Sequence, residues 1–224
     1  MADRLLEPTG MAIESLYIVG PERPVWGMES VPSFPVDLNG IPGDRHYGPT
    51  RTVREYQSLE LDGREVANDR QLIIAQASDM AAIAHSMDLP VEEIEQRSGK
   101  SIAHFMAEQL AINILVDSPT EHELSDTAVS GLVLVLGSDP KTAPAIKLSE
   151  YSRPCPKPVV QIVASLRALG LAPPLPIKEL TPEFKRAARA GRGWLGAVFA
   201  TGTAAVGETV SAYPSLLPRE PYAA

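Results

Sequence analysis

The stretch GLVLVLGSDPKTAPAIKLSEY, residues 131–151, decides the fold that the sequence predicts. Residues 132–136 are five consecutive apolar side chains, which is typical of a buried strand. Residues 145–151 largely alternate between apolar and polar side chains, as a strand with one buried face does. The connection between them begins with glycine and ends with proline, which favours a hairpin. The sequence therefore predicts a β core built around this hairpin.

Further strands are predicted on both sides of this hairpin, and a few helices between them. Short β-favouring runs occupy residues 12–19, 31, 34–38, 71–75, 112–116, 194–199 and 203–210. Apolar positions at helical spacing occupy residues 80–87 and 159–169, a helix starts near Pro90, and residues 102–110 fit a helix or a strand equally well. With about eight or nine short strands, the predicted class is mainly β (α+β), a strongly bent, barrel-like core with a few inserted helices.

The 224 residues are enough for one domain with a sizeable core. We expect a loose N-terminal arm at residues 1–10, the barrel-like domain at residues 11–212 and a C-terminal tail at residues 213–224. Residues 50–70 are polar and charged, and they read most simply as a solvated excursion whose role the sequence leaves open.

Charge and cysteine content limit the partners and the compartment. The chain has 20 Lys and Arg against 28 Asp and Glu, a net charge of −8, and so lacks the basic footprint of a nucleic-acid or anionic-membrane binder. Its apolar runs are too short to span a bilayer, and its first residues lack the apolar core of a secretory signal. The single cysteine, Cys155, excludes an intramolecular disulfide and fits a reducing compartment. We expect a soluble cytoplasmic protein with neither nucleic acid nor membrane as a partner.

The first group of chemically active residues lies in GIPGDRHYG, residues 40–48. Glycines allow a positive φ and a close approach of the backbone to a ligand. Arg45 offers a planar fork to phosphate or carboxylate, and Asp44 is placed to orient Arg45 or His46. The alternative is a surface turn in which Asp44 caps its own backbone and His46 is solvated. Both interpretations stay open from these residues alone.

The second group lies in RPCPKP, residues 153–158. Proline on both sides of Cys155 stiffens the backbone and holds the thiol at a defined place. The cations Arg153 and Lys157 favour a thiolate, which is a nucleophile and a soft-metal ligand. The alternative is a small buried cysteine, which needs neither the prolines nor the cations.

Common catalytic motifs are not found. The chain has no Gly-x-Gly-x-x-Gly after a strand, no phosphate-binding loop with the required glycine spacing and no His-Glu-x-x-His. A cysteine hydrolase would pair Cys155 with one of four histidines, but nothing in the local sequence supports such a pairing.

The order of the motifs resembles the MOSC domain, the family named for the C-terminal domain of molybdenum cofactor sulfurases. The likeness spans residues 11–212. It comprises a strand followed by GIPGDRH at 40–46, AINILV at 111–116, a Leu-rich strand that ends at Gly137, Pro154 with Cys155, GRGW at 191–194 and AVGETV at 205–210.

This resemblance implies a bent, barrel-like fold with a ligand cleft and a cysteine at its floor. In the family that cysteine either binds the molybdenum of a pterin cofactor or is proposed to carry sulfur as a persulfide. Cys155 is then the metal ligand or sulfur carrier, and it forms the predicted catalytic set with Asp44 and His46. The residues predicted to bind the cofactor are Arg45, Asn113, Arg153, Lys157 and Arg192. Pyridoxal phosphate is associated with the family only, since no domain for it is expected in this chain.

Some positions depart from the family pattern. Ala111 stands where the family has glycine, Lys157 lies near where many relatives have a second cysteine, and Glu208 stands where aspartate is common. Because no ferredoxin-type cysteines are found, a redox role requires an external electron donor, and sulfur transfer requires a sulfur donor.

Three functions fit the sequence. The first is a stand-alone MOSC-domain protein that binds a molybdenum pterin cofactor or carries sulfur on Cys155, for oxidoreductase or sulfur-transfer chemistry. The second is a metal-free enzyme that acts on an anionic small molecule, with Cys155 or His46 as acid, base or nucleophile and with Arg45 and Arg192 as a clamp. The third is a binding module without catalysis. The sequence indicates neither the substrate nor the oligomeric state.

Overall fold

The computed structural model describes residues 10–19, 28–53, 62–120, 124, 130–189 and 192–213. The strands are β1 (Met11–Val19), β2 (Met28–Val31), β3 (Ser33–Val36), β4 (Thr50–Thr52), β5 (Glu65–Ala67), β6 (Leu72–Gln76), β7 (Ile114–Asp117), β8 (Val133–Leu136), β9 (Ala145–Tyr151), β10 (Trp194–Ala200), β11 (Gly202–Ala205) and β12 (Thr209–Tyr213). The helices are α1 (Ala77–Ser86), α2 (Val91–Ser98), α3 (Ile102–Leu110), α5 (Lys157–Ala168) and α6 (Ile177–Ala187).

Eight strands form one bent sheet in the order β12-β8-β9-β10-β6-β7-β1-β2. β12 also pairs with β1, at Met11 with Val210 and at Ala12 with Thr209, which brings the two sides of the sheet together. The predicted hairpin is confirmed, because β8 and β9 pair in antiparallel register. β6 and β7 pair in parallel, and α1, α2 and α3 form the crossover between them. The predicted α+β class with a strongly bent sheet is confirmed.

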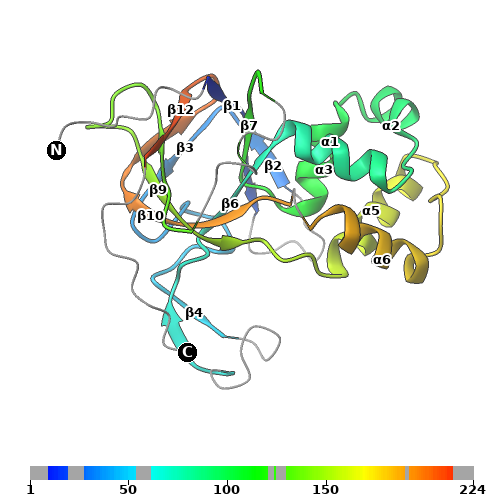
Figure 1. Cartoon of the computed structure of the whole chain (residues 1–224), viewed down its shortest axis with the longest axis horizontal. Helices are drawn as coiled ribbons and strands as arrows, with labels where there is room; N and C mark the ends of the chain where they lie inside the picture. The colour runs from blue at the N-terminus through cyan, green and yellow to red at the C-terminus, as the bar shows by residue number, and fades with distance from the viewer. Residues whose placement is uncertain are drawn as a thin grey trace.

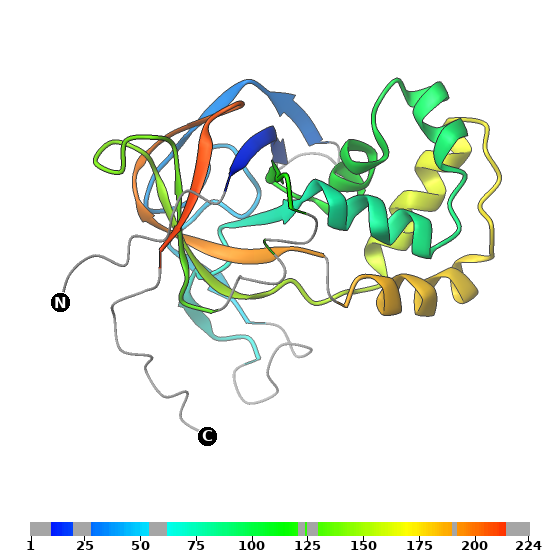
Figure 2. The same cartoon turned by 45° about the horizontal axis from the view of Figure 1, so that its top comes forward.

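The helices gather on one side of the barrel-like sheet, so that two separate cores share the strands between them (Figure 1). β6 has both faces buried: Leu72 and Ile74 pack in the core enclosed by the bent sheet, whereas Ile73 and Ala75 pack against the helices. Burial on both faces explains why the run is continuously apolar instead of alternating. Figure 2 shows the same division from a view turned by 45°.

The structure shows which element residues 102–110 form, where the sequence fitted a helix and a strand equally well. Residues 102–110 form α3, in which the Ser101 hydroxyl accepts a hydrogen bond from the His104 amide. The helix ends at Ala111, which adopts the left-handed conformation with φ of 58°. This is the position at which the family has glycine, the residue that takes a positive φ without strain.

The described residues form twelve strands, more than the eight or nine predicted. The additional strands are short and lie outside the main sheet. β11 pairs with β3, so the chain after β10 forms two strands instead of one. β4 and β5 form a hairpin within residues 50–70, where a solvated excursion was predicted. The predicted N-terminal arm and C-terminal tail lie, apart from Gly10 and Tyr213, outside the described residues.

Within the described part of the chain, none of the helices is long and apolar enough to cross a membrane.

Candidate functional site

The loop between β3 and β4 carries Asp44, a buried residue whose two carboxylate oxygens both accept hydrogen bonds. Gly43 has φ of 85° there, which a residue with a Cβ rarely adopts. The Asp44 Oδ2 atom accepts hydrogen bonds from the Val19 amide at 3.0 Å and from Asn113 Nδ2 at 2.7 Å. The Oδ1 atom accepts from the His46 amide at 2.8 Å. Asp44 therefore caps its own loop and also ties that loop to β1 and to the start of β7.

Asn113, which is fully buried, connects three parts of the sheet. Its Oδ1 atom accepts from the Ile73 amide at 3.0 Å, and its Nδ2 group donates to the Tyr17 carbonyl at 3.3 Å as well as to Asp44. Its backbone exchanges hydrogen bonds with the same neighbours, Ile73 and Tyr17. The amide thus bonds the Asp44 loop to both strands that flank β7.

His46 continues this chain of hydrogen bonds toward the surface. Its Nδ1 atom lies 3.1 Å from Asp44 Oδ1, and its Nε2 atom accepts a hydrogen bond from Arg45 Nε at 3.2 Å. A carboxylate only accepts, so Nδ1 carries the proton and Nε2 keeps its lone pair for Arg45. The order Asn113, Asp44, His46, Arg45 therefore leads from a buried amide to an exposed guanidinium.

Opposing influences act on the pKa of Asp44. Burial is the largest and raises it, but hydrogen bonds from the His46 ring, the His46 amide and the Val19 amide all stabilise the charged form. These bonds together outweigh burial, so the pKa of Asp44 is lowered from its ordinary value. The carboxylate is therefore ionised near neutral pH and can hold the His46 proton.

Cys155 lies between the end of β9 and the start of α5. It is half-buried, and Lys157 two positions later is the first residue of the helix, with Pro158 next. Proline suits the first turn of a helix because its missing N–H would have no partner there. The thiol consequently lies at the positive end of α5, where an anion is stabilised. The side chains of Arg153 and Lys157 are exposed on either side.

Arg192 interacts electrostatically with Cys155, and only 6% of its surface is exposed. One Nη group donates to the Arg153 carbonyl, and the Arg192 amide donates to the Tyr151 hydroxyl. Burial is the main influence on the guanidinium and lowers its pKa, whereas Cys155 and Tyr151 raise it. Its Nε group is buried with no hydrogen-bond partner among the described residues.

Gly193 fixes the backbone that presents Arg192. Its φ is 102°, and a Cβ there would lie 2.5 Å from the Ile74 carbonyl oxygen. The Gly193 carbonyl accepts from the Ser152 amide at 2.9 Å, which ties the start of β10 to the segment that leads to Cys155. Only glycine meets both requirements at this position.

The predicted site residues thus fall into two groups. Asp44, Arg45, His46 and Asn113 form one hydrogen-bonded chain. Cys155 raises the pKa of the Arg192 guanidinium, and the positive charge of Arg45 lowers it. Of the remaining predicted residues, Arg153 contributes its carbonyl and Lys157 the first turn of α5.

Tyr151 was not predicted as a site residue. Its hydroxyl accepts from the Arg192 amide and donates to the Ala188 carbonyl at 2.6 Å, and burial raises its pKa to about 12. It therefore stays protonated at neutral pH and can serve as donor and acceptor at once. An aromatic hydroxyl at the end of a predicted strand, just before the Arg153–Cys155 segment, is the signal that could have drawn attention to it.

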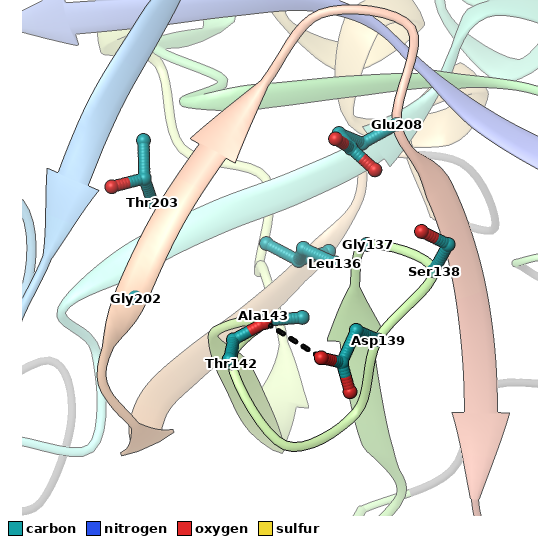
Figure 3. Close-up of a pocket in the computed structure, with 9 residues that line it drawn as sticks. All are labelled: Leu136, Gly137, Ser138, Asp139, Thr142, Ala143, Gly202, Thr203 and Glu208. Atoms are coloured by element: carbon teal, nitrogen blue, oxygen red, sulfur yellow. Dashed lines mark hydrogen bonds between the residues drawn. The ribbon is translucent and has the colours of Figure 1, made fainter.

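A hollow of about 340 Å³ lies elsewhere, at the far end of the β8–β9 hairpin. Its polar lining consists of Ser138, Asp139, Thr142, Thr203 and Glu208 (Figure 3). The Thr142 hydroxyl donates a hydrogen bond to Asp139 at 3.2 Å. Cys155 follows the opposite end of β9. The hollow and the Cys155 group are therefore separate features of the molecule. Among the described residues, no group of three or more His, Cys, Asp and Glu side chains could hold a metal ion by itself.

Comparison with known proteins gives the class of the fold. No protein-family model and no curated protein matches the chain. The structure is similar to that of the YuaD protein from Bacillus subtilis, with a TM-score of 0.70 and 21% identity over 90% of this chain and 94% of that chain. The YiiM protein from Geobacillus stearothermophilus matches at a TM-score of 0.48 and 15% identity, over 91% of this chain and 75% of that chain. The chain has a MOSC-like fold, as its motifs predicted.

Proposed function

We propose that the chain is a MOSC-fold protein whose reactive group is the thiol of Cys155, which binds a molybdenum pterin cofactor or carries sulfur as a persulfide. The observation that carries the proposal is the electrostatic interaction between this half-buried thiol and the buried guanidinium of Arg192. The sulfur also lies just before the first turn of α5, and this end of a helix attracts anions. The thiolate is the form that attacks sulfur and binds soft metals.

The residues present fit such a cofactor by their chemistry. Cys155 supplies one soft sulfur ligand, and the buried Nε group of Arg192 has no hydrogen-bond partner in the described part of the chain, so it can donate to an anionic group. Arg45, Arg153 and Lys157 add positive charge suited to the terminal phosphate of the pterin. When bound, the cofactor supplies two-electron redox chemistry. Asn113 belongs to the same proposal as a residue that holds the Asp44 loop in place.

The sulfur-carrying reaction needs only Cys155 and a donor. The thiolate attacks the outer sulfur of a persulfide donor, a new S–S bond forms on Cys155, and the donor leaves as a thiolate. An acceptor thiolate then takes that sulfur by the same exchange, which regenerates Cys155. The chain therefore needs an external sulfur donor protein, and a redox reaction would need an external electron donor.

Native mass spectrometry of the freshly purified protein tests the proposal. We expect the intact mass to include a molybdenum pterin, or one additional sulfur atom that is absent from Cys155→Ser. Metal analysis of protein from cells that make the cofactor gives an independent measure. Protein with neither metal nor persulfide, from such cells and after exposure to a persulfide donor, would disprove the proposal. The same spectrum gives the oligomeric state.

A second candidate is a metal-free enzyme in which His46 handles a proton. The contact that favours it is the pair Asp44 Oδ1 and His46 Nδ1 at 3.1 Å, since a carboxylate that orients an imidazole is common in acid–base catalysis. Cys155 would then be the nucleophile, and Arg45 with Arg192 would hold an anionic small molecule. Activity that survives removal of all cofactor and is lost in His46→Ala would favour this candidate.

We also propose that the protein acts in the cytoplasm, where a free thiol stays reduced. Cell fractionation with a tagged chain tests this directly. We propose no residue of this chain as a ligand of pyridoxal phosphate, which is associated with the family only.

A further inference from the structure

The hollow at the far end of the β8–β9 hairpin is bounded by three segments of the chain. The hairpin loop after β8 forms one wall, β11 forms the second, and the turn before β12 forms the third (Figure 3). Its volume of about 340 Å³ lies at the lower end of the range in which proteins bind small molecules. The Cys155 group uses none of the residues that line it, so the proposed function leaves the hollow unexplained.

Two glycines let the walls of the hollow come close together. A Cβ at Gly202 would lie 2.6 Å from the Thr142 carbonyl oxygen, and a Cβ at Gly137 would lie 2.9 Å from the Cβ of Ala143. The Gly137 amide also donates a hydrogen bond to the Thr209 carbonyl at 2.8 Å, which joins the hairpin loop to the start of β12. The walls are therefore packed and bonded to each other without any ligand, as is usual for a preformed site.

Glu208 carries a carboxylate that has no hydrogen bond or ion pair with any of the described residues. Its Oε2 atom lies 3.7 Å from the position that a Cβ on Gly137 would take, so the carboxylate faces the hairpin loop across the hollow. Asp139, the other carboxylate of the lining, is bonded within its own loop. Its Oδ1 atom accepts from the Lys141 amide at 3.0 Å, and its Oδ2 atom accepts from the Thr142 hydroxyl at 3.2 Å. Glu208 thus brings an uncompensated negative charge to the hollow.

The chemistry of the lining favours a cationic ligand. The described residues that line the hollow include two carboxylates and no lysine, arginine or histidine. The hydroxyl groups of Ser138, in the hairpin loop, and Thr203, in β11, add acceptors from the other two walls (Figure 3). A primary ammonium group has three donors that point in different directions, which suits acceptors on several sides, whereas a guanidinium presents a flat fork.

We infer that the hollow binds a small molecule with a primary ammonium group, which pairs with Glu208 and donates to the hydroxyl oxygens of Thr203 and Ser138. The volume decides between such a molecule and a bare metal ion. A water molecule occupies about 30 Å³ in the liquid, so a single ion would leave most of the hollow to solvent. Leu136 and Ala143 supply apolar surface for the carbon chain of an amine. This site is a second one, beyond the Cys155 group.

Titration of the full-length protein with butylamine tests this inference, and butanol is the neutral probe of the same shape. Nitrogen–proton NMR spectra of the labelled protein report both the affinity and the amides that respond. We expect butylamine to shift the amides of Ser138, Thr203 and Glu208. Butanol should bind roughly ten-fold more weakly or worse, because it cannot form the ion pair with Glu208. Added salt should weaken the binding of butylamine, since Glu208 is partly exposed.

Glu208→Gln is the informative variant, because it removes the charge but keeps the shape of the side chain. The fold should tolerate it, since the carboxylate has no partner to lose among the described residues. We expect the dissociation constant for butylamine to rise on the order of ten-fold, the effect of losing one charged hydrogen bond. Glu29→Gln removes the same charge from an exposed position on β2 and is the matched control, which should bind like wild type. Thr203→Val should weaken binding by a smaller factor, because it removes a neutral acceptor.

Several results would overturn the inference. These are equal binding of butylamine and butanol, an unchanged dissociation constant in Glu208→Gln, shifts confined to amides outside the hollow, and no binding of butylamine at all. A blocked lysine peptide that binds more tightly than butylamine would overturn the assignment to a small molecule, because the hollow would then recognise an amine carried by a protein. Cys155 follows the opposite end of β9, so none of these results depends on the proposed function.

Discussion

The side-chain amide of Asn113 donates a hydrogen bond to Oδ2 of Asp44 at 2.7 Å, across 69 positions of sequence. This bond joins the buried start of β7 to the loop that carries Arg45 and His46. The order of that loop, and with it the position of the Arg45 guanidinium, depends on a residue without any exposed surface. The stability of the fold and the geometry of the candidate site are therefore linked at one point.

Replacing Asn113 with alanine should destabilise the protein by about 2 to 4 kcal/mol, because it leaves the Ile73 amide and the Asp44 carboxylate short of buried partners. Denaturant unfolding measures the difference. Asn39→Ala, in the partly exposed turn after β3, is the control and should cost less than about 1 kcal/mol. An equal effect at both positions would contradict the role assigned to Asn113.

Asp44 should make the protein more stable at neutral pH than at low pH. The pKa of Asp44 is lowered in the folded state from its ordinary value of 3.8. As the pH falls, the carboxylate therefore takes up a proton in the unfolded chain before it does so in the folded one. The stabilisation is present above that pH and is lost as the pH falls through the folded-state pKa. The gap in unfolding free energy between wild type and Asp44→Asn should therefore narrow as the pH falls from 7 to 3. A gap independent of pH would show that ionised Asp44 adds nothing.

Glu14 should show the opposite pH dependence. Burial is the main cause that raises its pKa, nearby Asp117 adds to this, and His104 at 3.0 Å opposes it. The ionised form is therefore penalised in the fold, and stability present below the ordinary pKa is lost as the pH rises through the raised one. Glu14→Gln should stabilise the protein at pH 7 and lose that advantage near pH 4, as measured by thermal unfolding. Glu29→Gln, exposed on neighbouring β2, should change little at either pH.

Several parts of the fold could be predicted from the sequence because their signals are local. The β8–β9 hairpin follows from two strand patterns around a turn, and the helix after Cys155 from apolar spacing. β11 could not be predicted as a separate strand, because its partner is β3, far away in the chain. Residues 102–110 became a helix because α3 packs in the helical core, which no local pattern reports.

The residue types proposed for the candidate site could be read from the sequence, but the contacts between their side chains could not. In the sequence, Cys155 lies between the cations Arg153 and Lys157. In the structure, the thiol interacts electrostatically with Arg192, which lies 37 positions later in the chain. The sequence left open whether Asp44 caps its own turn or orients a neighbouring side chain. In the structure it does both, because its Oδ1 atom bonds the amide and the ring of His46. Long-range contacts made this difference, since only folding brings β1, β7 and β10 to the loops that bear these side chains.

Gly193→Ala should destabilise the protein more than Gly207→Ala. Both glycines have a positive φ, but a Cβ at Gly193 would lie 2.5 Å from the Ile74 carbonyl oxygen, whereas one at Gly207 would meet nothing within 4 Å. We expect a cost of about 2 to 5 kcal/mol at Gly193 from strain and overlap together, and about 1 to 2 kcal/mol at Gly207 from strain alone. Denaturant unfolding compares the two, and equal costs would mean that the backbone around Gly193 yields to the methyl group.

The neutral form of the His46 ring should carry its proton on Nδ1. Asp44 Oδ1 can only accept from Nδ1, and Arg45 Nε can only donate to Nε2, so both neighbours select the same tautomer. Long-range nitrogen–proton NMR correlation of the labelled protein distinguishes the two ring nitrogens. In Asp44→Asn the carboxylate is gone while Arg45 still donates, so the Nδ1–H form should persist with a weaker bond at Nδ1. In Arg45→Gln that form should also persist, because Asp44 alone selects it. If wild type instead carried the proton on Nε2, Arg45 could not donate to that atom, and the chain of hydrogen bonds from Asn113 to Arg45 would end at His46.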